Sequence, residues 1–308
     1  MQSNSPLVSI GIPTYNRPNE LKIAIESIVN QKYNNLEIIV SDNCSSDPAV
    51  EKLCKNYANI DSRIKYYRQD KNIGMAQNCY FIINKAIGDY FIWCLDDDWL
   101  SKNYIEESLK VILKDPGCSI VFGNMNFYNT EYQLIKKCPQ VHIEQSCYVE
   151  RMLTYCSTAI SSSLTCGLVS TKTMREVYTN NARLPEDWIF MMKILFLGKG
   201  RYLPSVSYNA LNNGVSKNIE SLKKGFNLPL LNEENFWDVM NIYIVDSILH
   251  DDFYVTRLER YDRISLALDI NKAIMHNKAS NAFFYKIRNK LKKIKDFIFD
   301  IFSKKLHR

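Results

Sequence analysis

The sequence predicts an α/β protein with a mainly parallel β-sheet and helices on its faces, and three observations support this fold class. Short apolar runs rich in β-branched residues alternate with segments of helical periodicity over residues 1–100. Strands that alternate with helices are joined by right-handed crossovers, which align the strands in parallel. The apolar fraction of 46% and the charged fraction of 23% are those of a globular protein, and 308 residues suffice for a sizeable core.

Four strands and three helices are expected in this first part of the chain. The strands are residues 7–12 (LVSIGI), 36–40 (LEIIV), 64–68 (IKYYR) and 89–95 (DYFIWCL). The helices are residues 18–29, about 48–58, and 74–87. The first helix begins at a proline, and its apolar residues recur every three or four positions, so one of its faces is expected to be buried.

After residue 100 the pattern is less regular. The expected helices are residues 101–115, 146–155, 185–200 and most of 220–276. The expected extended segments are residues 118–128 (CSIVFGNMNFY), as a strand pair or hairpin, 161–170 (SSSLTCGLVS) and 201–211. Glu186 and Asp187 fall in the first turn of a helix, where the helix dipole favours acidic side chains.

Polar segments follow the first, second and fourth expected strands. They are PTYNR, SDNCSSD and DDD. In open sheets of this kind, ligands bind outside the carboxyl ends of the strands. The three segments therefore predict a single site at this edge of the sheet.

The three adjacent acids Asp96, Asp97 and Asp98 are the most unusual of these segments. At a separation of about 5 Å and an effective dielectric constant near 20, each pair of carboxylates repels by roughly 3 kcal/mol. Either the side chains splay into water, as in a solvated turn with an N-cap aspartate, or a cation lies among them.

The composition disfavours several classes of protein. Nine cysteines lack CxxC spacing and four histidines lack ligand spacing, so we expect no zinc site and no disulfide framework, and a reducing compartment. The N-terminal residues have no basic segment followed by an apolar run, so no signal peptide is expected. No apolar run reaches about 18 residues, so no membrane span is expected. These features are typical of a cytoplasmic protein.

The positive charge of the chain is concentrated at its C-terminal end. Residues 277–308 contain ten Lys or Arg and two Asp, which gives the segment a net charge of +8. The whole chain has a net charge of only +6. Apolar and aromatic residues share one helical stripe of residues 280–308, opposite the basic residues. This pattern is typical of a helix that lies in the surface of an anionic membrane. The alternatives are a helix packed on the rest of the protein and, third, a nucleic-acid-binding tail, which does not need such a broad apolar stripe.

The motifs within residues 7–205 resemble those of glycosyltransferase family 2. The matching stretches are VSIGIPTYNRPNELKIAIESIVNQKYNNLEIIVSDNCSSD, NIG, GDYFIWCLDDDWL and PEDW. The resemblance implies a GT-A fold and an inverting enzyme that moves a sugar from a nucleotide-diphosphate donor, with a UDP-sugar favoured, to a glycan hydroxyl. It also implies Mn²⁺ or Mg²⁺ as cofactor. The bacterial members it most resembles build O-antigen or capsule repeat units on a polyprenyl-diphosphate-linked acceptor, at the inner face of the cell membrane.

The resemblance and the pattern of the remaining residues together predict a division of the chain. Residues 1–215 would be the catalytic domain, with a nucleotide-binding half (1–100) and an acceptor half (101–215). A helical extension (216–276) and the membrane-docking helix (277–308) would follow.

The resemblance assigns roles position by position. The donor-binding residues that it implies are Pro13, Thr14, Tyr15, Arg17, Asp42, Arg68, Asn72, Asp96 and Asp97. Asp42 would hydrogen-bond the base, and Arg68 and Asn72 would flank the nucleotide. Asp187 would be the catalytic base, with Glu186 in a supporting role.

Two departures from the family pattern affect these roles. The usual double acid after the second strand is reduced to Asp42, and the first Asp of the family's DxD motif falls on Leu95. Asp97 is therefore the expected metal ligand, with Asp98 as the second, and Asp96 takes over the ribose contact.

These residue types suit glycosyl transfer. A divalent cation bound by one or two carboxylates stabilises a departing diphosphate as a Lewis acid, and it would offset the repulsion within the acidic triplet. One positioned carboxylate can take the proton of the acceptor hydroxyl during a single displacement.

Two other functions stay open. A nucleotidyltransferase would want a glycine-rich, basic phosphate loop after the first strand, and PTYNRPNE has no glycine. A non-catalytic module that binds nucleotide-sugars or membranes could share the fold, and Leu95 in place of an acid keeps this alternative open.

Overall fold

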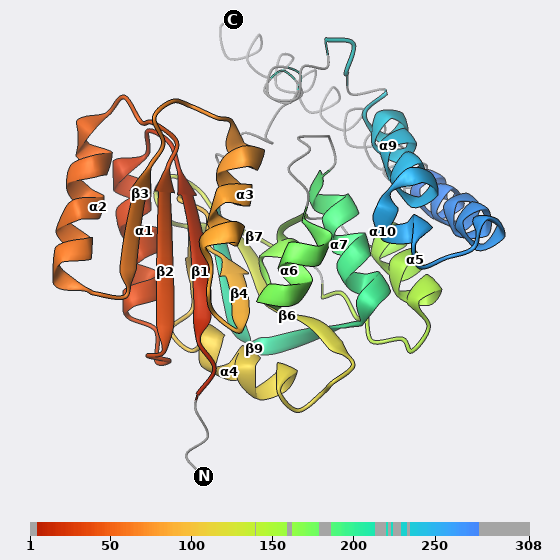
Figure 1. Cartoon of the computed structure of the whole chain (residues 1–308), viewed down its shortest axis with the longest axis horizontal. Coiled ribbons are helices and arrows are strands. Elements are labelled where there is room, and N and C mark those ends of the chain that lie inside the picture. The colour runs from red at the N-terminus through yellow and green to blue at the C-terminus, as the bar shows by residue number, and fades with distance from the viewer. Residues whose placement is uncertain are drawn as a thin grey trace, which may run out of the picture.

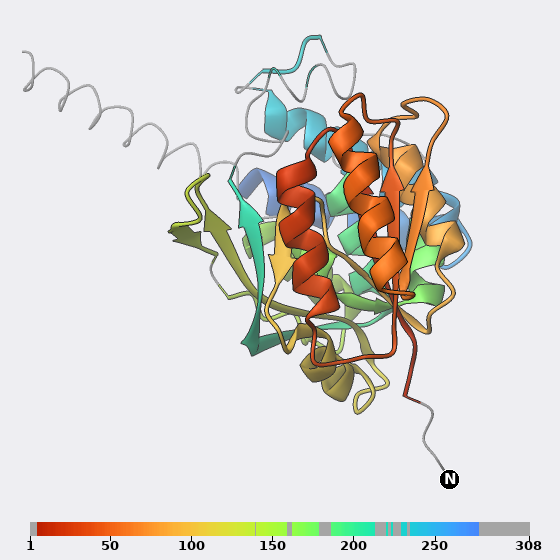
Figure 2. The same ribbon diagram turned by 90° about the vertical axis from the view of Figure 1, so that its left-hand side faces the viewer.

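The computed structural model describes residues 5–138, 140–158, 162–178, 186–212, 220, 223, 229–232 and 235–276. Four strands pair in parallel in the N-terminal half, as predicted. They are β1 (Val8–Thr14), β2 (Leu36–Asp42), β3 (Ile64–Arg68) and β4 (Tyr90–Trp93). The connecting helices are α1 (Pro18–Val29), α2 (Pro48–Ile60) and α3 (Met75–Lys85). Figures 1 and 2 show α1 and α2 on one face of these strands and α3 on the other.

Local sequence signals account for these elements. Every residue of β1 and of β2 is buried, as expected of parallel strands covered on both faces. Pro18 and Pro48 open their helices, and the side chain of Asp47 caps the second by accepting a backbone N–H of its first turn. Gly11 is required for close packing, because a Cβ there would lie 2.6 Å from the ring of Trp93.

The second half of the sheet contains antiparallel as well as parallel pairs. Its strands are β5 (Asp98–Leu100), β6 (Cys118–Tyr128), β7 (Leu134–Lys137), β8 (Leu168–Ser170) and β9 (Lys199–Leu211). Its helices are α4 (Tyr104–Ile112), α5 (Tyr148–Thr158), α6 (Thr171–Val177) and α7 (Glu186–Leu197). The strand order is β3-β2-β1-β4-β8-β6-β9-β5, with β7 paired to β6. This mixed sheet with flanking helices confirms the predicted α/β fold class (Figure 1).

Two predicted elements are wrong. Residues 118–128 form one continuous strand instead of a strand pair, and the pairing with β9 shifts register between Gly123 and Asn124, where β9 has the additional residues. A Cβ on Gly123 would lie 2.6 Å from the carbonyl oxygen of Val206, so this glycine permits close strand contact and not a chain reversal. Within residues 161–170, Ser162–Cys166 is a 3₁₀ helix, and only β8 is extended.

The helical extension packs against α7. It includes α9 (Phe236–His250), α10 (Asp252–Val255) and the helical residues 260–276. Lys193 of α7 is 1% exposed, and its ammonium lies 2.6 Å from the carboxylate of Asp251 at the start of α10. The rings of Trp188 and Trp237 also meet between α7 and α9, with centroids 5.9 Å apart. The extension is thus held on α7 by the ion pair of the buried Lys193 as well as by aromatic packing.

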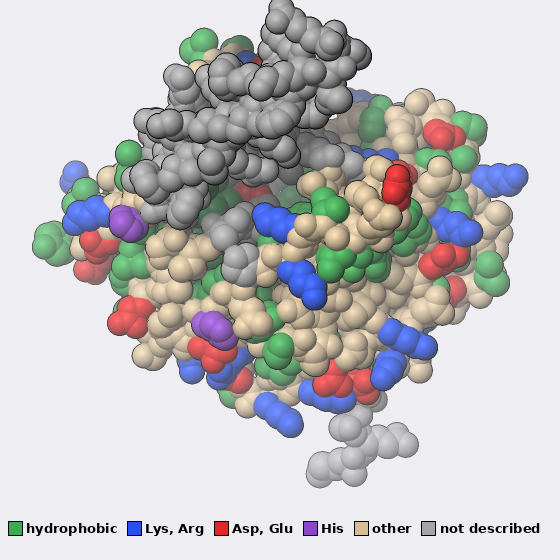
Figure 3. Space-filling model, turned by 180° about the vertical axis from the view of Figure 1, so that it is seen from behind, with side chains coloured by type: hydrophobic (Ala, Val, Ile, Leu, Met, Phe, Trp, Pro, Cys, Tyr) green, Lys and Arg blue, Asp and Glu red, His purple; other side chains and the backbone are tan. Residues whose placement is uncertain are grey.

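The surface of the described residues carries charges of both signs. Figure 3 shows acidic and basic side chains interspersed over the described part of the rear face. Across the described ranges, the structure contains no helix with the length and apolar character that a bilayer crossing requires. The predicted membrane-docking helix at 277–308 lies outside the described residues.

Candidate functional site

The carboxyl ends of β1, β2 and β4 bring the three polar segments together, as expected. Thr14, the last residue of β1, pairs with Asp42 at the end of β2. Its hydroxyl also donates to Oδ2 of Asp96, at 3.0 Å, in the segment that follows β4. The backbone N–H of Tyr15 donates to the same oxygen at 3.2 Å. The loop after β1 is therefore joined directly to the acidic triplet.

Asp96 and Asp97 converge on the guanidinium of Arg17. Its Nη1 lies 3.3 Å from Oδ1 of Asp96 and 2.6 Å from Oδ2 of Asp97. Burial raises the pKa of Asp96 to about 6, and the positive charge of Arg17 opposes this shift. Burial also raises the pKa of Asp97, against the same opposing charge. A cation does lie among the acids, and in this structure it is an arginine of the chain itself.

Asp98 has a different environment from its two neighbours. It is the first residue of β5, and its Oδ2 accepts a hydrogen bond of 2.6 Å from the hydroxyl of Tyr208 in β9. The same hydroxyl lies 3.3 Å from the backbone N–H of Leu95. Burial, followed by the charge of Asp97, raises the pKa of Asp98 well above its usual range. The side-chain contact of Asp98 with Tyr208 is thus structural, and the sequence pattern contains no signal for this partner.

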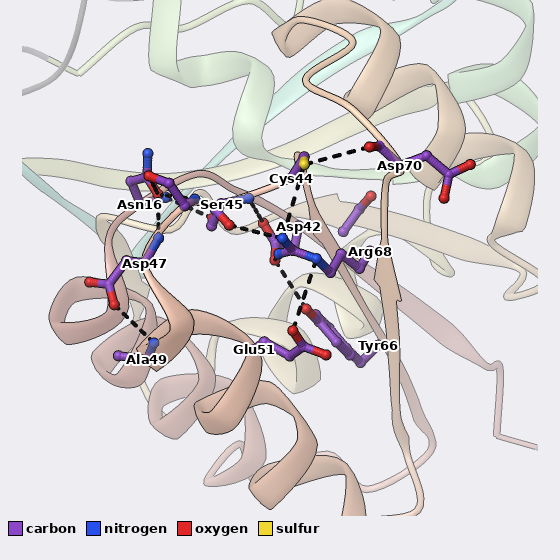
Figure 4. A network of polar contacts seen from close by, with 12 residues as sticks. Asn16, Asp42, Cys44, Ser45, Asp47, Ala49, Glu51, Tyr66, Arg68 and Asp70 are labelled. Atoms are coloured by element: carbon purple, nitrogen blue, oxygen red, sulfur yellow. Dashed lines mark hydrogen bonds and ion pairs between the residues drawn. The ribbon is translucent and has the colours of Figure 1, made fainter.

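Asp42 is the centre of a second polar network, drawn in Figure 4. Its carboxylate accepts hydrogen bonds from the Ser45 backbone N–H at 2.8 Å, the Tyr66 hydroxyl at 3.0 Å and Arg68 Nη1 at 2.7 Å. Arg68 also donates to the carbonyl oxygen of Ser45 at 3.0 Å. Asp42 is fully buried, so these donors satisfy it within the protein. A contact from Asp42 to a nucleotide base stays a prediction.

Asn72 closes the loop between β3 and α3. Its Oδ1 accepts from the side chain of Asn43 at 3.0 Å and from the backbone N–H of Gly74 at 2.9 Å. Gly74 has a φ of 82°, a conformation that suits glycine. The structure therefore connects Asn72 to the loop after β2, on the side of the sheet edge that Asp42 occupies.

Asn16 is a residue of this edge that the sequence analysis missed. It has a left-handed backbone with a φ of 57°, which asparagine tolerates better than most residues. Its Oδ1 accepts from the backbone N–H groups of Ser46, at 2.8 Å, and Asp47, at 3.1 Å (Figure 4). Asn16 thus fixes the loops after β1 and β2 to each other. Its place between Tyr15 and Arg17 was the available signal.

Asp187 lies at the start of α7 next to Glu186, and both side chains are partly exposed. Its Oδ1 accepts the backbone N–H of Trp188 at 2.9 Å. The pKa of the buried Cys166 thiol responds both to a charge at the start of α7 and to a charge in the acidic triplet. Burial raises the pKa of Cys166 to about 12, and the negative charges of Asp98 and of Asp187 both add to the shift. The two carboxylates therefore lie within electrostatic reach of the same thiol.

The site offers a limited set of metal ligands. Among the described residues, no group of three or more His, Cys, Asp or Glu side chains is arranged to hold a metal ion. Mg²⁺ and Mn²⁺ sites at phosphates need only one or two protein carboxylates, however. Asp96 and Asp97 both approach the single nitrogen of Arg17, so their oxygen atoms already converge on one point. This donor set fits a hard cation.

Comparisons with known proteins agree with the sheet-edge geometry. The sequence model of Glycosyl transferase family 2 matches residues 9–176. Glycosyltransferase GlyA of Streptococcus pneumoniae is 32% identical over 122 residues, which are 40% of this chain and 17% of that protein. The putative teichuronic acid biosynthesis glycosyltransferase TuaG of Bacillus subtilis is 24% identical over 223 residues, 71% of this chain and 84% of that protein.

A solved structure shares the fold. S. aureus TarS 1-349, crystallised in complex with UDP-GlcNAc, superimposes with a TM-score of 0.63 at 17% identity, covering 87% of this chain and 72% of that one. This likeness confirms the expected GT-A fold. The family match spans more than half of the chain, and the motifs that carry it lie at the sheet edge described above. The chain belongs to glycosyltransferase family 2.

Proposed function

We propose that this protein is an inverting glycosyltransferase, which moves a sugar from a nucleotide-diphosphate donor to a hydroxyl of a glycan acceptor. The convergence of Asp96 and Asp97 on one point at the carboxyl edge of the sheet is the main support, because a diphosphate needs a cation there. The UDP-GlcNAc complex of TarS supports a UDP-sugar as donor, and the name of TuaG supports a role in cell-surface polysaccharide synthesis.

The diphosphate would be held by Asp97, Asp96 and Arg17 together. Mn²⁺ or Mg²⁺ held by these carboxylates would act as a Lewis acid on the diphosphate. Arg17 would then be free to turn its guanidinium toward the phosphates, which it can contact with two parallel N–H groups. Asp98 is the weaker candidate ligand, because Tyr208 already holds its carboxylate.

The nucleotide would lie against the loops that Asn16 and Asn72 hold in place. Tyr15 is 44% exposed and could stack on the base, next to Pro13. Asp42 and Arg68 would contact the base or ribose by exchanging one of their present hydrogen bonds for one to the ligand.

Asp187 would remove the proton from the acceptor hydroxyl. It opens a rigid helix, and it shares the neighbourhood of Cys166 with the acidic triplet. Glu186 would support it. A single carboxylate in this position is what one displacement with inversion requires.

The acceptor in this proposal is polyprenyl-diphosphate-linked, as in O-antigen or capsule synthesis. The basic amphipathic segment 277–308 would dock on the anionic inner face of the membrane, where such acceptors reside. Deleting residues 280–308 should then release the protein from anionic vesicles in a sedimentation assay. Persistent binding would favour the alternative of a packed helix.

Asp187→Asn tests the catalytic part of the proposal. A screen of nucleotide-sugars for donor hydrolysis first identifies the donor. The variant should retain wild-type affinity for UDP in the presence of Mn²⁺ and lose transfer by about 10²- to 10⁴-fold, because only the base is removed. Full turnover by the variant would remove Asp187 from this role. UDP binding by the wild-type protein with no turnover of any donor would favour the non-catalytic binding module.

A further inference from the structure

Three aromatic rings form a cluster on the strands that follow the acidic triplet. Trp99 of β5 comes directly after Asp98, and its ring centroid lies 4.8 Å from that of Tyr128 and 5.8 Å from that of Tyr132. Tyr128 ends β6, and Tyr132 lies in the turn to β7. Tyr132 is 43% exposed, and the other two are half-buried. We call Trp99, Tyr128 and Tyr132 the aromatic platform.

A row of side-chain amides runs across the sheet beside the platform. The strand register places Trp99 next to Asn209 of β9, and Asn209 next to Asn126 of β6. Asn126 donates to Oδ1 of Asn209 at 2.9 Å, and Asn209 donates to the backbone oxygen of Trp99 at 3.3 Å. Tyr128 lies two residues after Asn126, so the two side chains share a face of the sheet.

One hydrogen-bond acceptor of the amide row has no partner among the described residues. Asn126 is 9% exposed, and its Oδ1 has no hydrogen-bond partner among the described residues. A buried acceptor without a partner is uncommon in folded proteins, and a water molecule or a ligand usually accounts for it. The row therefore contains a buried acceptor that no described residue satisfies.

The platform lies next to the carboxylates of the candidate site. Tyr128 pairs with Leu211 of β9, and the backbone N–H of Leu211 lies 3.3 Å from the backbone oxygen of Asp97. Trp99 directly follows Asp98 in β5, so the platform begins beside the acidic triplet, on the face of the strand opposite to the Asp98 side chain.

A sugar ring is the ligand that this combination of groups fits. The C–H groups on one face of a pyranose carry partial positive charge, and the negative face of an aromatic ring attracts them. The hydroxyl groups at the rim of the sugar ring need hydrogen-bond partners, and side-chain amides can supply them. A purely apolar ligand would leave these amides unused. We propose that the aromatic platform binds a pyranose ring of the acceptor glycan next to the donor. This inference rests on the proposed glycosyltransferase function.

Tyr132 gives the sharpest test, because it is the most exposed ring of the platform. Wild-type protein and variants are applied to an array of purified O-antigen, capsule and teichoic-acid fragments. Tyr132→Ala should lower the affinity for the glycans that the wild type binds by about tenfold, since it removes a stacking ring. Tyr132→Phe keeps the ring and should bind like the wild type. Tyr261→Ala is the matched control, because Tyr261 is an exposed tyrosine of the C-terminal extension, 81% exposed.

A second measurement separates this proposal from the proposed function. Calorimetry of UDP binding with Mn²⁺ on the same variants reports on the donor side, and Tyr132→Ala should leave it unchanged. Glycan binding that depends on Tyr132, in a protein that does not bind UDP, would support the platform and count against the transferase. A wild type that retains no glycan, or a Tyr132→Ala variant that binds glycans like the wild type, would overturn the platform.

Discussion

Two aspartate–arginine contacts lie at the same edge of the sheet, and they differ in how the carboxylate is satisfied. Asp42 receives donors from Arg68, Tyr66 and the backbone, all within one closed network. Asp96 and Asp97 instead share one nitrogen of Arg17, and burial raises the pKa of both. The Asp42 network joins the loop after β2 to strand β3. Asp96 and Asp97 are both buried, and the single charge of Arg17 offsets only part of the negative charge of the two ionised carboxylates. This arrangement suits the binding of a further cation.

Substitution of Asp97, which contacts Arg17 together with Asp96, should have the largest effect on UDP binding. Asp97→Asn should weaken the Mn²⁺-dependent affinity for UDP by at least about 100-fold, because it removes the charged ligand that comes closest to Arg17. Asp98→Asn is the matched control, since its carboxylate is held by Tyr208, and its effect should be much smaller. Calorimetry with and without the metal measures both. Equal losses in the two variants would mean that Asp98 turns toward the ligand.

Substitution of Asp42, which accepts hydrogen bonds from Tyr66 and Arg68, should mainly reduce the stability of the fold. Asp42→Asn keeps the shape of the side chain but presents an N–H₂ group where Tyr66 or Arg68 now donates. The fully buried position should therefore lose about 2 kcal/mol of unfolding free energy, measured by urea denaturation at pH 7. A variant with wild-type stability would show that the network rearranges at little cost.

Asparagine in place of Asp96 should instead increase the unfolding free energy at pH 7. Because its pKa is raised to about 6, the folded protein binds this proton more tightly than the unfolded chain does. The favourable contribution is therefore present at pH 4 and is lost as the pH rises through 6. At pH 7, Asp96→Asn should increase the unfolding free energy by about 1–3 kcal/mol, and this gain should vanish near pH 4. Urea denaturation at both pH values measures it, and a destabilised variant at pH 7 would contradict the proposed difference between the two contacts.

The parts of the fold that were predicted correctly are those that local sequence specifies. The strands β1, β2 and β4 are continuous apolar runs because helices cover both of their faces. Such strands end where polar residues begin, so the convergence of the three polar segments could be predicted as well. The amphipathic helix α1 follows from its spacing in the same way.

Long-range pairing decided the features that could not be predicted. Asp98 is part of a strand because it pairs with Ala210 in β9, and nothing near Asp98 in the sequence indicates this. Tyr208, which holds its carboxylate, is separated from it by 110 positions. Arg17 is predicted to be one of the donor-binding residues, and nothing near it in the sequence indicates that its guanidinium contacts two acids. In each case a contact between distant segments determined the side-chain environment.

The buried ammonium of Lys193 has a practical consequence for anyone who shortens this protein. Lys193 belongs to the helix that Asp187 opens, whereas its carboxylate partner Asp251 lies beyond the boundary at residue 215 that the sequence suggests. Truncation at that boundary would remove the counter-charge of Lys193 together with the helices that cover it, and it would also uncover the ring of Trp188, which packs on Trp237. Expression fragments and chimaeras should therefore exchange both helices as one piece.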